Sequence, residues 1–357
     1  MLRRFVALPT ALFSALFSAL FWRLCCLLCC VLGLLPFWLP SAQAAPGGAP
    51  ARTLRFEHLS VDQGLAQESV LAVAQDGDGF MWFGSQGGLS RFDGYRVINY
   101  RNATGDARSL VNNWVRVLHI DPKGRMWIGT DGGLDLFDPA TRSFRHYRPG
   151  EAQRNGNGNR RIRTIVDDGH GALWLGTGDG LQHFDPASGA FQAWHHDSAN
   201  PASLADDQIG ALALDRAGTL WIGTNAGLDS LAGRGAPFIH HTAAGADPKL
   251  TAVAALMADR SNTLWIGSQG GLESWKLGQP GAPRVALGAA HGLKAGAISA
   301  LYQDAEGAVW VGSCVDGLYL WDGAARRFAN YRHAPGDNRS VGDNQVSALY
   351  RDRVGTF

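Results

Sequence analysis

Asp76-Gly77-Asp78-Gly79 has the form of the start of a calcium loop, in which alternate acids present oxygens to a hard cation. The remaining ligands of such a loop do not follow. The same Asp and Gly recur at the same spacing in Asp121 with Gly124, Asp168 with Gly171, Asp215 with Gly218, and Asp304 with Gly307. An Asp and a Gly that recur at this spacing in most units indicate a turn, because Asp accepts backbone hydrogen bonds and Gly adopts positive φ. We therefore predict no metal at this stretch.

Two pairs of adjacent histidines, His195-His196 and His240-His241, could also be metal ligands, since neutral imidazole is a common one. Adjacent residues on a strand point to opposite faces, however, so neither pair can easily chelate one ion. His241 stands where other parts of the chain have a large aromatic residue. We interpret both pairs as packing residues of outer strands, and we assign no metal ligand in the chain.

A cluster of arginines lies in the Gly/Asn-rich stretch EAQRNGNGNRRIR and consists of Arg154, Arg160, Arg161 and Arg163. Arginine forks pair with planar anions, so the cluster could attract an acidic glycan or a phosphate. A solvated loop is the simpler interpretation. No Ser/His/Asp arrangement or carboxylate pair has a spacing that requires catalysis, so we predict no catalytic residue and no cofactor, and we leave the ligand-binding residues unassigned.

Residues 1–44 have the order of a secretory signal, with a basic start, a long apolar run and a small-x-small site at the end. We predict cleavage between Ala44 and Ala45, followed by a linker over residues 45–53. The net charge of the whole chain is +1, which suggests no nucleic-acid partner.

The rival interpretation of this segment is an uncleaved membrane anchor over residues 24–39, which is shorter than the roughly 20 residues that span a bilayer. Four of the five cysteines lie in the segment, at Cys25, Cys26, Cys29 and Cys30. We interpret them as apolar filler, because a targeting peptide offers no folded metal cage. Cys314 alone remains in the exported part, which therefore has no intrachain disulfide.

The elements that must position all these residues follow from an internal repeat. Its marker is a tryptophan followed two places later by a glycine. The tryptophans are Trp82, Trp127, Trp174, Trp221, Trp265 and Trp310, and the glycines are Gly84, Gly129, Gly176, Gly223, Gly267 and Gly312. The tryptophans would fill the wedge between structural units, and the glycines would allow close approach.

Each unit of the repeat contains an apolar run ending in Asp, an Asp-x-x-Gly turn, the Trp segment, a Gly-Leu segment and a final aromatic stretch. Four short strands in about 45 residues predict one β-propeller blade. The predicted fold is therefore all-β, a β-propeller over residues 54–357 with six complete four-stranded blades and a truncated seventh.

The two ends of the predicted propeller are also related. The stretch Phe56 to Leu59 is similar to the last part of a unit although it precedes the first unit. We expect it to supply the outer strand of the final blade. The seventh unit begins at Ser347, and the chain stops one residue before its expected Trp. We expect the sequence to be a fragment, a truncated gene or an interrupted reading frame.

The repeats resemble the two-component regulator propeller repeats of bacterial periplasmic sensors. The resemblance rests on LSVDQGLAQESVLAVAQDGDGFMWFGSQGGLSRFDGY at residues 59–95, and on the connection Asn200-Pro201-Ala202-Ser203-Leu204, which has counterparts at residues 106–110 and 337–341. In that family the propellers precede a membrane helix and a histidine kinase or diguanylate cyclase. No motif of either output domain occurs in this chain.

The resemblance implies a non-catalytic, periplasmic, ligand-sensing propeller of a membrane-bound receptor. The expected ligand is a small molecule or a glycan, and the full-length receptor is expected to be a homodimer. Two alternatives from other classes stay open. One is a propeller enzyme, either a lyase or a quinone-dependent dehydrogenase. The other is an exported protein-interaction scaffold.

Overall fold

A computed structural model describes residues 54–148, 160–241, 251–294 and 296–356 of the chain. The predicted signal peptide over residues 1–44, its cleavage between Ala44 and Ala45, and the linker lie outside the described residues. Within the described ranges, none of the helices has the length and apolar character that crossing a membrane would require.

The described part contains six antiparallel four-stranded sheets. The first three are β1 (Val70–Gln75), β2 (Met81–Ser85), β3 (Gly88–Phe92) and β4 (Val97–Tyr100); β5 (Val115–Ile120), β6 (Met126–Thr130), β7 (Gly133–Asp138) and β8 (Ser143–Tyr147); and β9 (Ile162–Asp167), β10 (Leu173–Thr177), β11 (Leu181–Asp185) and β12 (Ala190–Trp194).

The other three sheets are β13 (Ile209–Leu214), β14 (Leu220–Thr224), β15 (Gly227–Leu231) and β16 (Ile239–His241); β17 (Val253–Ala258), β18 (Thr263–Ser268), β19 (Gly271–Lys276) and β20 (Arg284–Leu287); and β21 (Ile298–Gln303), β22 (Val309–Ser313), β23 (Leu318–Asp322) and β24 (Arg327–Tyr331). Two single-turn 3-10 helices accompany them, η1 (Val61–Gln63) and η3 (Ala289–His291).

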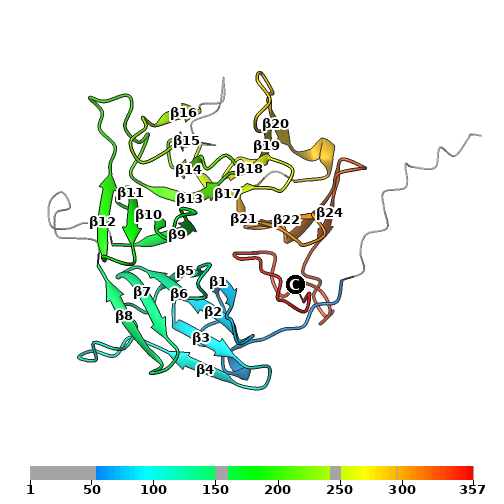
Figure 1. Cartoon of the computed structure of the whole chain (residues 1–357). Coiled ribbons are helices and arrows are strands. Elements are labelled where there is room, and N and C mark those ends of the chain that lie inside the picture. Colours follow the sequence, from blue (N-terminus) through cyan, green and yellow to red (C-terminus); the bar gives the residue numbers. More distant parts are fainter. Residues whose placement is uncertain (1–53, 149–159, 242–250, 295, 357) are drawn as a thin grey trace, which may run out of the picture. The chain divides into compact units, whose positions relative to one another are not determined.

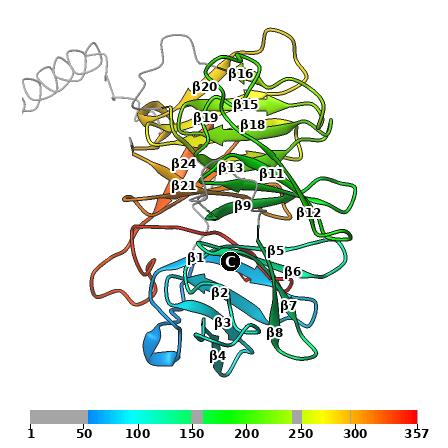
Figure 2. The ribbon, with the colours of Figure 1, turned by 90° about the vertical axis from the view of Figure 1, so that its left-hand side faces the viewer.

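The sheets are the blades of a propeller, which confirms the predicted all-β fold with six four-stranded blades. The first strands of consecutive blades contact one another from β1 to β21. Figure 1 shows the blades following one another in chain order around a common centre, with β1 near the centre and β4 at the outside. Figure 2 shows the same outward order of β1, β2, β3 and β4 from a second direction.

The repeated tryptophans lie in the second strand of each blade and are at most 6% exposed. In five blades the indole Nε1 donates a hydrogen bond to the Asp that begins the preceding turn; for Trp127 the distance to Asp121 Oδ2 is 2.9 Å. In the fifth blade this turn has Asn262 in place of the Gly. In the third blade His183 Nε2 bonds to Asp168 Oδ2 instead, at 2.9 Å. The Asp therefore joins the turn to the packing residue, a link that the sequence analysis did not include.

The repeated glycines lie in the same second strands, against the next blade. A Cβ placed on Gly129 would be 2.4 Å from Val117 Cγ1 and 2.9 Å from Cγ2 of Ile162, the first residue of β9. Since even a methyl group would meet side chains of two strands, glycine lets neighbouring blades approach closely.

The other five repeated glycines are confined in the same way. A Cβ on each would lie 3.0 Å or less from a side chain of its own first strand or of the next unit; these residues are Gly84, Gly176, Gly223, Gly267 and Gly312. For Gly84, Gly223 and Gly267 the nearest side chains are Val115, Val253 and Ile298 of the next blade, at 2.6, 2.6 and 2.7 Å. For Gly176 the nearest is Thr164 of its own blade, at 2.4 Å.

Gly312, in the sixth blade, extends this pattern beyond the six sheets. A Cβ there would lie 3.0 Å from Val346 Cγ1, and Val346 follows the sixth blade in the chain. Val346 thus holds the place that the first strand of the next blade holds for the other glycines.

Phe56 to Leu59 has no strand assignment, and neither have residues 345–356. The Phe56 side chain nevertheless packs in the cluster around Trp310. Its amide donates to Arg339 O at 3.2 Å, as the amide of Phe144 in β8 donates to Arg108 O at 2.9 Å. Arg108 and Arg339 hold the same place in the connecting segments. The contacts place Phe56 where an outer-strand residue would lie, while the seventh blade itself stays a prediction.

Candidate functional site

The blades differ most at one end of their strands, where two kinds of loop meet. One loop joins the second strand to the third, and the other joins the fourth strand to the first strand of the next blade. We call this end the loop face. Its side chains differ from blade to blade, whereas the opposite end carries the repeated Asp-x-x-Gly turns. A site with one specificity is therefore expected at the loop face.

Three arginines gather on the loop face around one carboxylate, and we call Arg116, Arg161 and Arg163 the arginine cluster. Arg116, in β5, binds both oxygens of Asp131 in the β6–β7 loop, with Nη2 3.1 Å from Oδ2. Arg161 Nε lies 3.1 Å from Asp131 Oδ1. Arg163, in β9, donates from Nη2 to Gln208 Oε1 at 3.2 Å. Residues of three blades thus meet here.

The electrostatics of the cluster favour an anion. Burial lowers the pKa of Arg163, and the charges of Arg161 and Arg116 lower it further, against an opposing effect of Asp131. The side chains of Arg116 and Asp131 are about one-fifth exposed, so their charges are only partly screened by water. Two guanidinium groups, those of Arg116 and Arg161, bind the carboxylate of Asp131, and the third, that of Arg163, feels its charge without binding it. An incoming carboxylate, sulfate or phosphate could pair with the unmatched positive charge.

An aromatic ring accompanies the charges. The guanidinium of Arg116 lies over the ring of Trp114, 4.8 Å from its centroid. Trp114 is 36% exposed, in contrast to the buried tryptophans of the repeat. A flat, partly exposed ring next to cationic forks is an arrangement that can bind a sugar ring carrying an anionic group.

The predicted arginine stretch is divided by the structure. Arg161 and Arg163 belong to the cluster, Arg160 is exposed, and Arg154 lies outside the described residues. The sequence analysis missed Arg116, Trp114, Asp131 and Gln208. A signal for Arg116 was present, because the equivalent second position of the first strand is Gly210, Ala254 or Ser299 in later blades.

The histidine pairs are split between different contacts. His240 Nδ1 bonds to Asp229 Oδ1 at 2.7 Å, while His241 Nε2 bonds to Ser230 Oγ at 2.8 Å. His196 Nδ1 bonds to the carbonyl oxygen of Leu204 at 2.6 Å, and His195 points elsewhere. The members of a pair thus do not share one ion, in keeping with the alternation of a strand.

Asp76 has both carboxylate oxygens occupied. Oδ1 accepts from the amides of Asp78 and Phe80, each at 3.0 Å, and Oδ2 accepts from Trp82. The carboxylate of Asp76 thus accepts hydrogen bonds from its own turn and from the strand that follows. A hollow of about 570 Å³ lies beside this turn, between the first two blades and at the opposite end from the loop face. Its lining combines residues of β6, β7 and β8 with residues of the Asp-x-x-Gly turns of both blades.

The family comparison agrees with the repeat. A model of the two-component regulator propeller matches residues 64–87, 109–132, 203–226 and 292–314, each match ending at the Trp segment or just beyond it. The first, second, fourth and sixth blades thus match the model of the two-component regulator propeller repeat. The resemblance noted from the sequence is thereby confirmed.

Two proteins that are similar to this chain are longer than it is. Histidine kinase P4 of Formosa agariphila is 38% identical over 55 residues, which are 15% of this chain and 4% of the kinase. The extracellular domain of a putative hybrid two-component system of B. thetaiotaomicron superposes with a TM-score of 0.71 at 24% identity, over 84% of this chain and 39% of that one. The chain therefore spans well under half of these relatives, and the structural likeness establishes the propeller fold.

The propeller fold also occurs in enzymes. Virginiamycin B lyase of Staphylococcus aureus superposes with a TM-score of 0.52 at 12% identity, over 75% of this chain and 85% of the lyase. A likeness at this identity concerns the fold, and fold alone does not determine activity.

A buried carboxylate near the loop face gives a pH-dependent prediction. Asp135, in β7, is fully buried, and burial raises its pKa to about 6 although the amide of Val111 and the ring of His146 favour its charged form. The native state therefore holds this proton more tightly than the unfolded chain. The stabilisation of the native state by this proton is fully present below pH of about 3.8 and is lost as the pH rises through about 6.

We expect Asp135→Asn to remove this pH dependence. Between pH of about 4 and 6 the wild type should lose up to about 3 kcal/mol of unfolding free energy relative to the variant, at about 1.4 kcal/mol per pH unit. Urea unfolding followed by circular dichroism at several pH values measures it. Asp138→Asn is the control, because hydrogen bonds from Thr141 and Ala140 lower the pKa of that exposed carboxyl. Equal pH profiles for wild type and Asp135→Asn would contradict the assignment.

Proposed function

We propose that this propeller is the periplasmic, ligand-sensing part of a membrane-bound signal-transduction receptor. Its output domain, a histidine kinase or a diguanylate cyclase, would lie in the full-length parent, which we expect to act as a homodimer. The described propeller itself is proposed to be non-catalytic. Support comes from the repeat family and from the likeness in fold to extracellular domains of hybrid two-component systems.

The observation that carries the proposal is the arginine cluster beside Trp114. Its positive charge comes from the second and third blades, and Gln208 of the fourth blade accepts a hydrogen bond from Arg163, so an anion bound there would lie where three blades meet. A ligand can shift a receptor between two states only if it binds them with different affinity. A site built from several blades meets this condition when the blades move slightly against one another. We therefore propose an anionic ligand, either an acidic glycan or a phosphorylated small molecule.

Binding to the full chain tests the proposal directly. The probes are oligogalacturonate, a chondroitin sulfate oligosaccharide and inorganic phosphate, with a neutral malto-oligosaccharide for comparison. Isothermal titration calorimetry should detect binding of at least one anionic probe and not of the neutral one. Arg163→Gln should weaken that binding about tenfold or more, since a hydrogen bond to a charged group contributes about 1.5–3 kcal/mol.

The matched control is Arg216→Gln. Arg216 is exposed and lies in an Asp-x-x-Gly turn at the opposite end of the blades, so its loss changes the net charge equally. We expect less than about a twofold change in affinity from this variant. If Arg216→Gln weakens binding as much as Arg163→Gln, the attraction is general charge and the proposed site is wrong. Lack of binding by every anionic probe would also overturn it.

Completion of the ring belongs to the same proposal. We propose that Phe56 to Leu59 and residues 346–356 contribute to a seventh blade. The bond from the Phe56 amide to Arg339 supports it, as does His58, whose Nε2 bonds to Asn338 O at 3.0 Å in the way that His240 Nε2 bonds to Pro201 O at 2.9 Å.

A further inference from the structure

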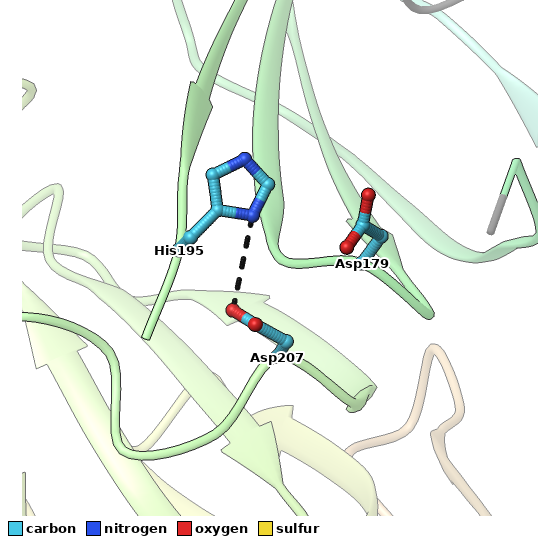
Figure 3. A group of neighbouring side chains, drawn as sticks. All are labelled: Asp179, His195 and Asp207. Carbon is cyan, nitrogen blue, oxygen red and sulfur yellow. Dashed lines mark ion pairs between the residues drawn. The ribbon is translucent and has the colours of Figure 1, made fainter. Parts of the chain in front are cut away.

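Three potential metal ligands converge on the loop face of the third and fourth blades. Asp179 lies in the β10–β11 loop, His195 directly follows β12, and Asp207 precedes β13. One ligand atom of each lies within 4.8 Å of the other two. Figure 3 shows the three side chains approaching one another from three separate segments. We call these residues the Asp-His-Asp trio.

The trio differs from what most blades have at these positions. The position of Asp179 is held by Gly87, Gly132 and Gly270 in the first, second and fifth blades, by Ala226 in the fourth and by Asp316 in the sixth. The position of His195, one residue after the fourth strand, is held by Arg101, Arg148 and Arg332, and that of Asp207 by Asn113 and Asn344. The sixth blade shares the acid, but it has Arg332 and Asn344 at the other two positions. The combination of two acids and a histidine at one point in space therefore indicates a task specific to the third blade.

The hydrogen bond that Asp207 accepts from the backbone does not require a negative charge. Its Oδ1 accepts from the amide of His196 at 2.6 Å, and Asn113 and Asn344 accept from the amides of Asn102 and His333 in the same way, at 2.7 and 3.0 Å. An asparagine thus performs this task elsewhere in the ring. The fold therefore has no need of the negative charge of Asp207.

Asp179 supplies an independent sign of an absent ligand. Its Oδ2 is buried and has no hydrogen-bond partner within the described part of the chain. His195 Nδ1 is 3.9 Å from Asp207 Oδ1, which is too far for a hydrogen bond. A buried, unpaired carboxylate oxygen is costly unless a cation compensates it.

In the sixth blade the corresponding acid is paired with cationic side chains. The Gly180 amide donates to Asp207 O and the Gly317 amide to Asn344 O, both at 2.8 Å, so the two loops have the same backbone bonding. There Asp316, the counterpart of Asp179, pairs with Arg332 Nε at 3.1 Å and Lys294 Nζ at 3.3 Å. The third blade has a histidine in place of that arginine.

The two loops therefore differ in the number of negatively and positively charged side chains that face one another. In the sixth blade one carboxylate faces two cationic side chains and a neutral asparagine. In the third blade two carboxylates face one imidazole. Two arginines of the arginine cluster are engaged elsewhere, because Arg161 binds Asp131 and Arg163 binds Gln208. A divalent cation would supply the charge that Arg332 and Lys294 supply in the sixth blade.

We propose that Asp179, His195 and Asp207 bind one divalent transition-metal ion, with Zn²⁺ as the representative. One imidazole nitrogen and two carboxylate oxygens suit a borderline ion better than Ca²⁺ or Mg²⁺, which prefer oxygen alone. Tetrahedral bonds of about 2.1 Å hold ligand atoms about 3.4 Å apart, so the distances within the trio must shorten by up to about 1.4 Å, which side-chain rotation can provide. A fourth position stays open for water or a ligand group.

The proposal is independent of the proposed sensing function, and metal binding alone tests it. The full chain, stripped with a chelator, is titrated with ZnCl₂ by calorimetry at about 0.15 M salt, which screens exposed charges beyond about 8 Å. One ion per chain should bind. Asp207→Asn retains the bond to the His196 amide and should lower the affinity for Zn²⁺ at least about 10–100-fold. Asp179→Asn should do the same.

Asp206→Asn is the matched control. Asp206 is the neighbouring residue, carries the same charge and accepts the Gln208 amide at 2.6 Å through an oxygen that asparagine keeps. It should change the affinity less than about threefold. His195→Arg, which copies the sixth blade, should abolish Zn²⁺ binding while preserving the fold by circular dichroism. Bound Co²⁺ should show visible absorption bands that His195→Arg removes.

Three results would overturn the proposal. One is the absence of a single-ion binding step in the wild type. Another is an equal loss of affinity in Asp206→Asn and Asp207→Asn, which would mark a general acidic patch. The third is Ca²⁺ binding as tight as Zn²⁺ binding with no dependence on His195.

Discussion

Trp127→Ala is expected to lower the free energy of unfolding by about 3–5 kcal/mol. Trp127 is fully buried, and its ring packs against Tyr147 and Phe184, with centroids 5.6 and 5.5 Å away. Phe184 belongs to the next blade, so the truncation would leave a cavity between two blades. The cost combines lost apolar burial with that cavity, because the rigid strands around it cannot collapse fully.

The same substitution removes a hydrogen bond from a buried acid. Burial acts to raise the pKa of Asp121, but hydrogen bonds from Trp127 and Arg125 outweigh it and hold that pKa below its usual range. Without the indole, the pKa of Asp121 should rise, so part of the destabilisation should be smaller in acid than at neutral pH. Urea unfolding followed by circular dichroism measures both effects.

Trp114→Ala is the control for Trp127→Ala. Trp114 is 36% exposed and lies outside the repeat, so its truncation should cost no more than about 1 kcal/mol. A loss below about 1 kcal/mol in Trp127→Ala would mean that the repeated tryptophan is not a main packing residue between blades.

Gly88→Ala is expected to destabilise the fold by about 2–5 kcal/mol, the next largest effect. Gly88 begins β3 with φ of +123°, a conformation that costs other residues about 1–2 kcal/mol. A Cβ there would also lie 2.5 Å from the carbonyl oxygen of Tyr100 in β4. That oxygen belongs to the backbone of a paired strand and cannot move aside cheaply, so overpacking adds about 1–3 kcal/mol.

The chain provides a control at the same place of another blade. Gly271 begins β19 with φ of +132°, and a Cβ there would meet nothing within 4 Å. Gly271→Ala should therefore show only the conformational cost of about 1–2 kcal/mol. Chemical denaturation of both variants separates the two causes. Equal losses would show that the close carbonyl contributes nothing.

Much of the architecture could be predicted from the sequence because it is repeated. A tryptophan that returns every 44 to 47 residues, with a glycine two places later, defines the length of a blade and the position of its second strand. Period-2 alternation and turn residues define the remaining strands. These local signals act within a few residues, so they can be recognised without knowing which blades are neighbours.

The Asp-to-indole bond was not predicted although both residues were singled out. Asp121 was interpreted as a turn residue and Trp127 as a wedge, and the pairing of β5 with β6 brings the two together. His183 in the third blade makes the exception visible, since it takes the place of the indole at Asp168. A hydrogen bond between residues of different segments depends on the register in which the strands pair, and the repeat alone does not give that register.

The candidate sites could be predicted least. In the sequence, Arg163 and His195 stand out only together with residues near them in the chain, Arg160 and His196. The residues that matter to them come from other blades or other loops, Arg116 and Asp131 for Arg163, and Asp179 and Asp207 for His195. Neighbours in the chain point to opposite faces of a strand, while residues far apart in the chain meet where loops converge.

The sequence by itself determined the class of fold, the six four-stranded blades and their length, and the resemblance of the repeats to a known family, because each blade is a local unit encoded by its own segment. Only the tertiary structure decided which non-repeating side chains meet. Closure of strands around a common centre brings the loops of different blades to one face, and the distances there depend on packing between blades. The arginine cluster and the Asp-His-Asp trio exist as groups only after that closure.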